Sequence, residues 1–245
     1  MTPQNLTSPL LSENAPGAEL SLLEEGARYA LLQRMTPVLQ HQVMGNFQSM
    51  DMIAVMMDRR LQSASPDLDS MRQDCELLGS VSESAIRSVI NLLTWVRPKP
   101  AATQRFDAGV EECATLLHNE FKLKGLSIAN EVSQIPAEFS SRTLRSTVSA
   151  ALVCLSDQST APATLTLRAR VLPDRIELSI DLRIDEQQQA RTVMANGYRL
   201  LNWRDLELLA CAESVGLARS DGGAQLTFNL PSQNQGLPAD RVAIR

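Results

Sequence analysis

The chain has 245 residues, of which 44% are hydrophobic and only 4% aromatic, and its formal net charge at pH 7 is −5. This length suits one large domain or two small ones. The negative charge argues against binding of nucleic-acid phosphates as the main activity, and no apolar run approaches the ~20 residues needed to span a bilayer. We therefore expect neither nucleic acid nor membrane among the partners.

Residues 1–19 are rich in Pro, Ser and Asn and lack the charged and continuous apolar regions of a signal peptide. They predict a flexible tail and a cytoplasmic protein. The four cysteines, Cys75, Cys113, Cys154 and Cys211, are widely spaced, and no pair has the spacing of metal ligands. We expect them to be buried free thiols in a reducing compartment.

Residues 20–62 predict one long helix, because apolar side chains recur at spacings of three and four. Pro37 lacks a backbone donor, so we expect a kink or a fresh helix start there, capped by Thr36. A second helix follows the turn at 63–70 and runs to about Val96. Each helix has a broad apolar face that the hairpin alone cannot bury. A second copy would complete a four-helix bundle, so we predict a homodimer.

After the linker near Pro98 and Pro100, helical and strand patterns alternate. In residues 176–184 apolar side chains alternate strictly, which is typical of a sheet with one buried face. The further predicted helices cover 107–124, 140–155 and 203–215, and the strands cover 126–132, 163–171, 176–184 and 224–231. The predicted fold class is α+β. The predicted domains are a tail (1–19), an antiparallel helical hairpin (20–98), an α/β sandwich (105–231) and a C-terminal tail (232–245).

Four segments resemble the core of a sensor histidine kinase, and they occur in the same order. VLQHQVMGNFQSM (38–50) resembles the H-box, LLHNEFKLKGLSI (116–128) the first helix–strand unit, LRSTVSAALVCL (144–155) the N-box helix, and GGAQLTFNLP (222–231) the closing strand. The resemblance covers roughly residues 25–231. It implies a dimerisation and phosphoacceptor hairpin followed by an ATPase-like α/β sandwich.

The nucleotide-binding positions depart from the kinase pattern. Ala150 and Cys154 stand where the N-box has asparagines that hold Mg²⁺ and phosphate, and neither side chain binds a hard cation. The DxGxG nucleotide box is replaced by the sequence DEQQQ at 185–189, and Gly222-Gly223 is more typical of a turn than of a phosphate cradle. We expect no ATP binding and no cofactor of the chain's own.

His41 is the candidate functional residue. At about 100° per residue it projects almost opposite the apolar stripe of its helix, and we expect it to face solvent. Gly45 leaves space beside the imidazole, and two methionines offer adaptable apolar contact to a partner. The predicted partner-binding face consists of Arg34, Gly45, Gln48, Met52, Met56 and Arg59. For the second histidine, His118, we expect a helix-packing role.

Two functional interpretations remain open. An exposed imidazole can accept a phosphoryl group from a phospho-aspartate and return it to another, and the segment is similar to kinase-derived histidine phosphotransferases of the sporulation type. Their motif has the form H-D-x-x-N-x-L-Q, which His41 and Gln48 match and Phe47 matches loosely. Gln42 and Gly45 depart from it, and the Gln42 amide cannot act as the base that a kinase carboxylate provides. The resemblance implies phosphorelay between response-regulator receiver domains, which would supply Mg²⁺; the alternative is a catalytically silent dimer that binds and regulates a response regulator.

Overall fold

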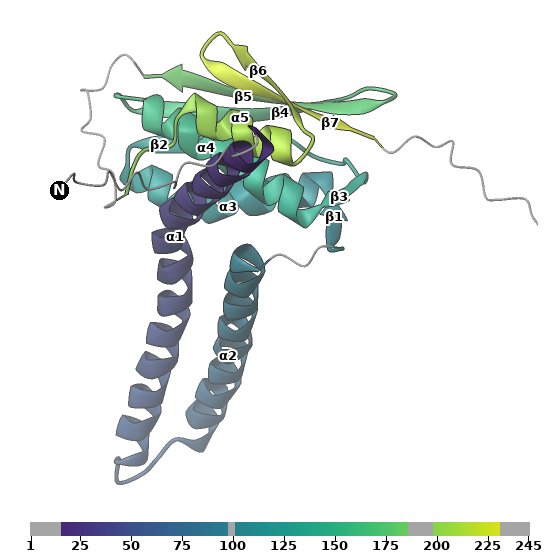
Figure 1. Ribbon diagram of the computed structural model, residues 1–245. Coiled ribbons are helices and arrows are strands. Elements are labelled where there is room, and N and C mark those ends of the chain that lie inside the picture. The colour runs from purple at the N-terminus through teal and green to yellow at the C-terminus, as the bar shows by residue number, and fades with distance from the viewer. Residues whose placement is uncertain (1–15, 98–100, 186–197, 231–245) are drawn as a thin grey trace, which may run out of the picture.

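The computed structural model describes residues 16–97, 101–185 and 198–230. Helices α1 (Pro16–Leu61) and α2 (Leu68–Val96) form an antiparallel hairpin that extends away from a layered body of helices and sheet (Figure 1). α1 begins four residues earlier than predicted, so the end of the predicted tail 1–19 is helical. The rest of that tail and the predicted tail 232–245 lie outside the described residues.

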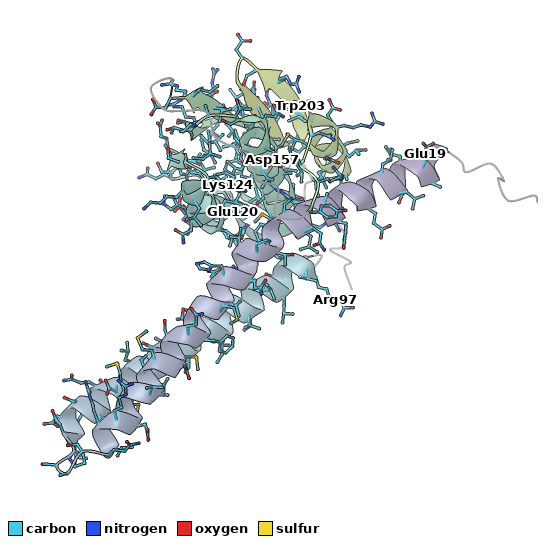
Figure 2. The ribbon with its side chains drawn as sticks, turned by 90° about the vertical axis from the view of Figure 1, so that its left-hand side faces the viewer. Glu19, Arg97, Glu120, Lys124, Asp157 and Trp203 are labelled. Atoms are coloured by element: carbon cyan, nitrogen blue, oxygen red, sulfur yellow. The ribbon has the colours of Figure 1, made fainter. Side chains whose placement is uncertain are left out.

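α1 continues through Pro37 without a fresh start. The Thr36 hydroxyl donates to the carbonyl of Leu32 (2.8 Å), so it bonds back into the helix instead of capping one. Back-bonding of this kind, together with the missing proline donor, bends helices. Figure 2 shows that α1 changes direction where it passes from the layered body into the hairpin.

The two hairpin helices contact each other through a narrow set of side chains. Ile53 and Ala85 are buried between them, the Asn46 amide donates to the Ser88 hydroxyl (2.8 Å), and Arg60 pairs with Asp74 (2.6 Å). Much of the apolar surface of both helices stays exposed. The large exposed apolar residues of the hairpin beyond Pro37 are Met44, Phe47, Met52, Val55, Met56, Leu61, Leu68, Leu77, Ile86, Ile90, Leu93 and Val96.

The layered body contains a five-stranded sheet in the order β2-β4-β5-β7-β6, in which only β2 and β4 run parallel. Helices α3, α4 and α5 cover one of its faces (Figure 1). The strands are β2 (Leu126–Asn130), β4 (Ala163–Val171), β5 (Arg175–Ile184), β6 (Gly216–Ser220) and β7 (Gly223–Asn229), and the helices are α3 (Phe106–Leu123), α4 (Ser141–Gln158) and α5 (Trp203–Ala212). Strands β1 (Thr103–Arg105) and β3 (Glu138–Ser140) form a separate short pair.

The predicted buried face of β5 is confirmed at Ile176, Leu178 and Ile180, which are fully buried beneath the helices. Towards the end of the strand it is lost, because Leu182 is only partly buried and Ile184 is 55% exposed. The helix predicted to end at Val215 ends instead at Ala212, and Gly216 opens the unpredicted edge strand β6. Strand β6 has the sequence GLARS and is mostly exposed, so it lacks the alternation of apolar and polar residues that signals a strand. Gly222, at φ +80°, lies in the turn that joins β6 to β7, as predicted for Gly222-Gly223.

The hydrophobic core joins the sandwich to the N-terminal half of α1. The α1 residues in this core are Ala27, Ala30, Leu31, Met35 and Leu39, which pack with residues of α3, α4 and α5. Arg28 adds a polar anchor, because its guanidinium donates to Glu213 (2.7 Å), which also accepts from Arg142 and Thr143. The division into a hairpin domain (20–98) and a sandwich domain (105–231) stays a prediction. A single hydrophobic core contains residues of both ranges.

The thiol prediction is only half right. Cys113 and Cys154 are buried, whereas Cys75 and Cys211 are exposed on outward helix faces. Burial raises the pKa of Cys113 to about 12 and that of Cys154 to about 11, so both stay protonated at neutral pH. Within the described ranges, no helix combines the length and apolarity that a membrane span requires.

Candidate functional site

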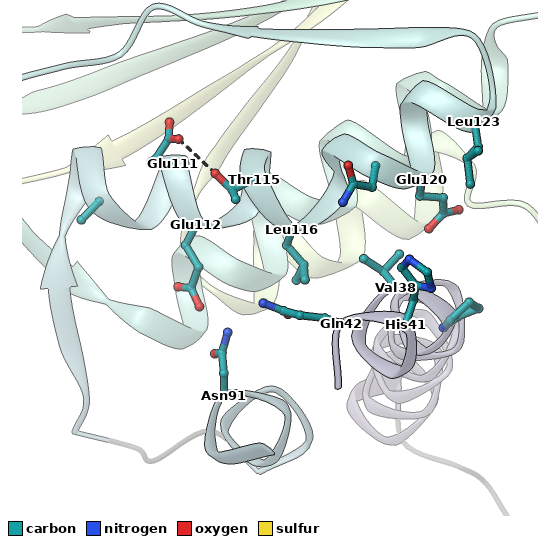
Figure 3. A pocket seen from close by; sticks show the side chains of 13 residues that line it. Val38, His41, Gln42, Asn91, Glu111, Glu112, Thr115, Leu116, Glu120 and Leu123 are labelled. Atoms are coloured by element: carbon teal, nitrogen blue, oxygen red, sulfur yellow. Dashed lines mark hydrogen bonds between the residues drawn. The ribbon is translucent and has the colours of Figure 1, made fainter. Parts of the chain in front are cut away.

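His41 is exposed on α1 and lies at the rim of a cleft of about 750 Å³ between α1, α2 and α3 (Figure 3). On the N-terminal side of His41 the layered body covers this face of α1, and from His41 onward the face is exposed. The cleft is lined by Pro37, Val38, His41 and Gln42 of α1, Asn91 of α2, and Ala108, Glu111, Glu112, Thr115, Leu116, Asn119, Glu120 and Leu123 of α3.

A network around Arg145 of α4 ties the end of α2 to α3. Its guanidinium donates to both carboxylate oxygens of Glu112 (2.7 and 3.1 Å), to Thr94 (2.7 Å) and to Asn91 (3.1 Å). It also lies 5.4 Å from the centre of the Trp95 ring. The two parallel hydrogen bonds of a bidentate arginine–carboxylate pair fix both the distance and the relative orientation of the two groups. The network therefore holds α2 and α3 at a defined separation and sets the width of the cleft.

The glutamates of the cleft differ in what they contact. Glu111 accepts from Thr115 of the same helix (3.0 Å) and from the amide of Asn130 at the end of β2 (2.6 Å). Glu120 pairs through one oxygen with Lys124, one turn later in the chain. Its other oxygen is buried and has no hydrogen-bond partner among the residues described. Figure 3 shows the Glu120 carboxylate and the His41 imidazole at the same end of the cleft.

The prediction that Arg34 lies on an exposed partner-binding face is wrong. Arg34 shares the helix face of His41, two turns earlier, but α4 and α5 cover that face on the N-terminal side of Pro37. Its guanidinium forms a buried ion pair with Asp157 of α4. The other oxygen of Asp157 accepts from the backbone of Leu201 (2.9 Å). Burial raises the pKa of Asp157 above its ordinary value, although Arg34 acts in the opposite direction.

The remaining predicted partner-binding residues, Gly45, Gln48, Met52, Met56 and Arg59, are exposed on the hairpin beyond the cleft. Met52 is 64% exposed and Met56 41%. A Cβ atom added at Gly45 would meet no atom within 4 Å, so the surface beside His41 is open. The structure brings these five residues together on one side of α1, and it separates Arg34 from them.

The positions that correspond to the N-box asparagines are inside the core. Ala150 and Cys154 are both fully buried in α4, and the Cys154 sulfur accepts from the Gln158 amide (3.1 Å). Of the DEQQQ segment only Asp185 lies within the described residues. Nowhere in the described ranges do three or more His, Cys, Asp or Glu side chains gather in a way that could hold a metal ion.

Sequence reasoning placed His118 in a packing role, but the structure places it on the exposed side of α3. It also missed Arg145 and Glu120. The spacing of Glu120 and Lys124 suits an ion pair on a helix, but no sequence signal shows that α3 faces α1.

A scan against protein-family models and a search of curated proteins both give no match. Among solved structures, the histidine kinase AdeS of Acinetobacter baumannii is 14% identical, with coverage of 74% of this chain and 96% of that one and a TM-score of 0.39. A histidine kinase from Burkholderia phymatum is 14% identical, with coverage of 80% and 97% and a TM-score of 0.38. The histidine kinase ThkA in complex with the response regulator protein TrrA is 9% identical, with coverage of 89% and 68% and a TM-score of 0.39. At such TM-scores the matches carry no argument about what this chain does.

Proposed function

We propose that this chain is a histidine phosphotransferase: His41 takes a phosphoryl group from the phospho-aspartate of one receiver domain and passes it to the aspartate of another. The observation that carries the proposal is the exposed imidazole at the rim of the cleft, beside the open surface at Gly45. A nitrogen lone pair of the imidazole attacks phosphorus, and the bond between phosphorus and the aspartate oxygen breaks. The electron pair of that bond stays on the aspartate carboxylate.

Phosphotransfer between receivers needs no nucleotide from this chain. The burial of Ala150 and Cys154 supports this part of the proposal, because neither position offers a ligand for Mg²⁺ or phosphate. The Mg²⁺ ion that balances the charge of the transferred group would come with the receiver domain.

The exposed apolar side chains of the hairpin support a homodimer. Exposed positions repeat every seven residues on α1, at Phe47, Ala54 and Leu61, and on α2 at Ile86 and Leu93. A spacing of seven keeps such side chains on one seam along a helix pair. A second copy of the hairpin would cover both seams at once in a four-helix bundle.

The second candidate is a catalytically silent dimer that binds and regulates a response regulator. The neutral amide of Gln42, next to His41 at the cleft, favours it, because an amide cannot take a proton from the imidazole at neutral pH. Both candidates use the same face of α1. They differ in whether phosphate ever resides on His41.

The test uses purified receiver domains from the same genome, phosphorylated with radiolabelled acetyl phosphate. We expect acid-labile label on the wild-type chain and none on His41→Ala, while His118→Ala, the matched control at the other exposed histidine, keeps it. Gly45→Leu should block docking while it favours the helix by about 1 kcal/mol. If Gly45→Leu weakens receiver binding and no label reaches His41 in any variant, the silent regulator is correct. If neither substitution affects any receiver, this face is not the functional surface.

A further inference from the structure

Glu120 is a mostly buried carboxylate beside the candidate phosphoacceptor. Its side chain is 13% exposed. One oxygen binds Lys124, and the other is buried without a hydrogen-bond partner among the described residues. In Figure 3 the carboxylate projects from α3 toward the end of the cleft where the His41 imidazole projects from α1.

A buried acceptor without a partner destabilises a folded protein, and more so when it is charged. Such groups are therefore rare, and they concentrate where function requires them. The other two glutamates of the cleft are fully engaged, Glu112 by Arg145 and Glu111 by Thr115 and Asn130. Of these three cleft glutamates, Glu120 is thus the one whose carboxylate has an acceptor without a partner among the described residues.

Phosphoryl transfer to an imidazole creates a need for such an acceptor. When one ring nitrogen forms the bond to phosphorus, the ring gains positive charge, and the proton on the other nitrogen becomes a strong donor. A carboxylate that accepts from this N–H fixes the ring orientation and offsets the charge without itself becoming protonated. Gln42, the neighbour of His41 in the chain, carries no charge and cannot offset it.

The geometry points to Glu120 as the positioning residue of His41: its free oxygen accepts from the imidazole nitrogen that does not carry phosphate. This inference rests on the proposed phosphotransfer. It also assigns a function to the sandwich, because α3 supplies the carboxylate that is missing next to His41 in the hairpin, where the chain has Gln42. The two groups form no ion pair in the described chain. Hydrogen bonds of this kind are often long in free proteins and shorten when a partner docks.

The charged groups around Glu120 leave its second oxygen available. Lys124 engages the first oxygen from the same helix. Asp157 and Arg34, which come from α4 and α1, are paired with each other through one nitrogen of Arg34; its other two nitrogens have no partner among the described residues and form no hydrogen bond with Glu120. Lys124 and Glu120 lie near enough to Asp157 to shift its pKa in opposite directions, and Figure 2 labels all three residues in the part of the layered body next to α1.

The test uses phosphoramidate, a small donor that phosphorylates imidazoles without a protein partner; the P–N bond of the donor breaks and ammonia leaves. All variants carry His118→Ala, because the exposed His118 would also be labelled; the rate of labelling of the full chain then reports on His41 apart from docking. We expect Glu120→Gln, which keeps an acceptor for Lys124, to slow labelling at least tenfold with an unchanged melting temperature. The matched control, Glu111→Gln on the same helix and cleft, should stay within twofold of wild type.

A rescue variant separates positioning from a structural role. Gln42→Glu restores a carboxylate next to the imidazole, so the double variant Gln42→Glu/Glu120→Gln should regain most of the lost rate. Equal labelling rates for wild type and Glu120→Gln would overturn this inference, whereas the proposal that His41 carries phosphate would still stand. A loss that Gln42→Glu does not restore would also overturn it. No labelling of His41 in the wild-type chain would remove the proposed function itself, and this inference with it.

Discussion

Arg34 and Asp157 form an ion pair between α1 and α4 in which only 2% and 3% of the side chains are exposed. Two of the Arg34 nitrogens are buried without a partner among the described residues, so the charge is incompletely compensated. Removing one partner of a buried pair leaves the other charge alone in a medium of low polarity. Removing both can be nearly neutral.

We expect Arg34→Met to lower the free energy of unfolding by about 3–5 kcal/mol, because Asp157 is left as an unpaired buried charge. The double variant Arg34→Met/Asp157→Asn should recover most of this, since asparagine keeps an acceptor for the backbone of Leu201. Urea denaturation measures both values. A double variant as unstable as the single one would show that the pair is a net source of stability.

Asp107 ties the start of α3 to neighbouring backbone. It accepts from Arg105 through both oxygens (3.0 and 2.6 Å) and from the backbone of Ile135 (3.1 Å). The Arg105 hydrogen bonds, assisted by those of the backbone, lower the pKa of Asp107 from 3.8 to about 2. Because the folded pKa lies below the unfolded one, the stabilisation is present above the unfolded value and is lost as the pH falls from about 4 to about 2.

We therefore expect the melting temperature to fall over that acid range, and Asp107→Asn to flatten this part of the profile while it lowers stability at neutral pH. Thermal unfolding at a series of pH values tests both effects. Parallel profiles for wild type and Asp107→Asn would assign the acid transition to other carboxylates.

At the scale of elements, two glycines have opposite roles. Gly26 lies in α1, where an added Cβ would meet nothing within 4 Å, whereas a Cβ at Gly223 in β7 would lie 2.3 Å from the carbonyl oxygen of Ile180. Gly26→Ala should raise stability by about 1 kcal/mol through helix propensity alone. Gly223→Ala should lower it by more than about 2 kcal/mol, because backbone must move. Chemical denaturation of the two variants measures both changes in the free energy of unfolding. Equal changes for the two variants would contradict this description of the contact between β5 and β7.

Helical and strand periodicity predicted the hairpin, α3 to α5 and the buried face of β5, because each of these elements has a regular apolar side. The short strands β1 and β3 and the edge strand β6 lack such a side and were missed. For the site, periodicity placed Arg34 and His41 on one helix face correctly. It could not show that α4 and α5 cover this face at Arg34 and leave it exposed at His41, nor that α3 places Glu120 in the same cleft as His41. Those facts depend on how the elements pack, which local patterns do not encode.

At the scale of the whole molecule, the exposed seam on the hairpin predicts that the chain self-associates. Ile86 and Leu93 are 59% and 56% exposed in the single chain. A charged residue in place of Ile86 or Leu93 would lose its hydration inside the predicted four-helix bundle, so the bundle should not form. We expect light scattering at micromolar concentration to give a dimer for wild type and a monomer for Ile86→Asp. Arg87→Ala, on the same helix, is the control that should remain dimeric, and a monomeric wild type would refute the prediction.

The core shared between α1 and the sandwich also has a consequence for the order in which the chain is made. Synthesis runs from the N-terminus, so the apolar face formed by Ala27, Leu31 and Met35 leaves the ribosome long before α5, which ends at Ala212. At 5–20 residues per second, α5 follows roughly 10–35 s later. During that time α3 and α4 emerge, but the first half of α1 still lacks its packing against α5. A helix whose apolar face is incompletely covered is a form that chaperones recognise and that aggregates when unprotected. Nascent chains of this protein should therefore depend on chaperones until α5 has emerged, even though the earliest element in the sequence is also the longest helix.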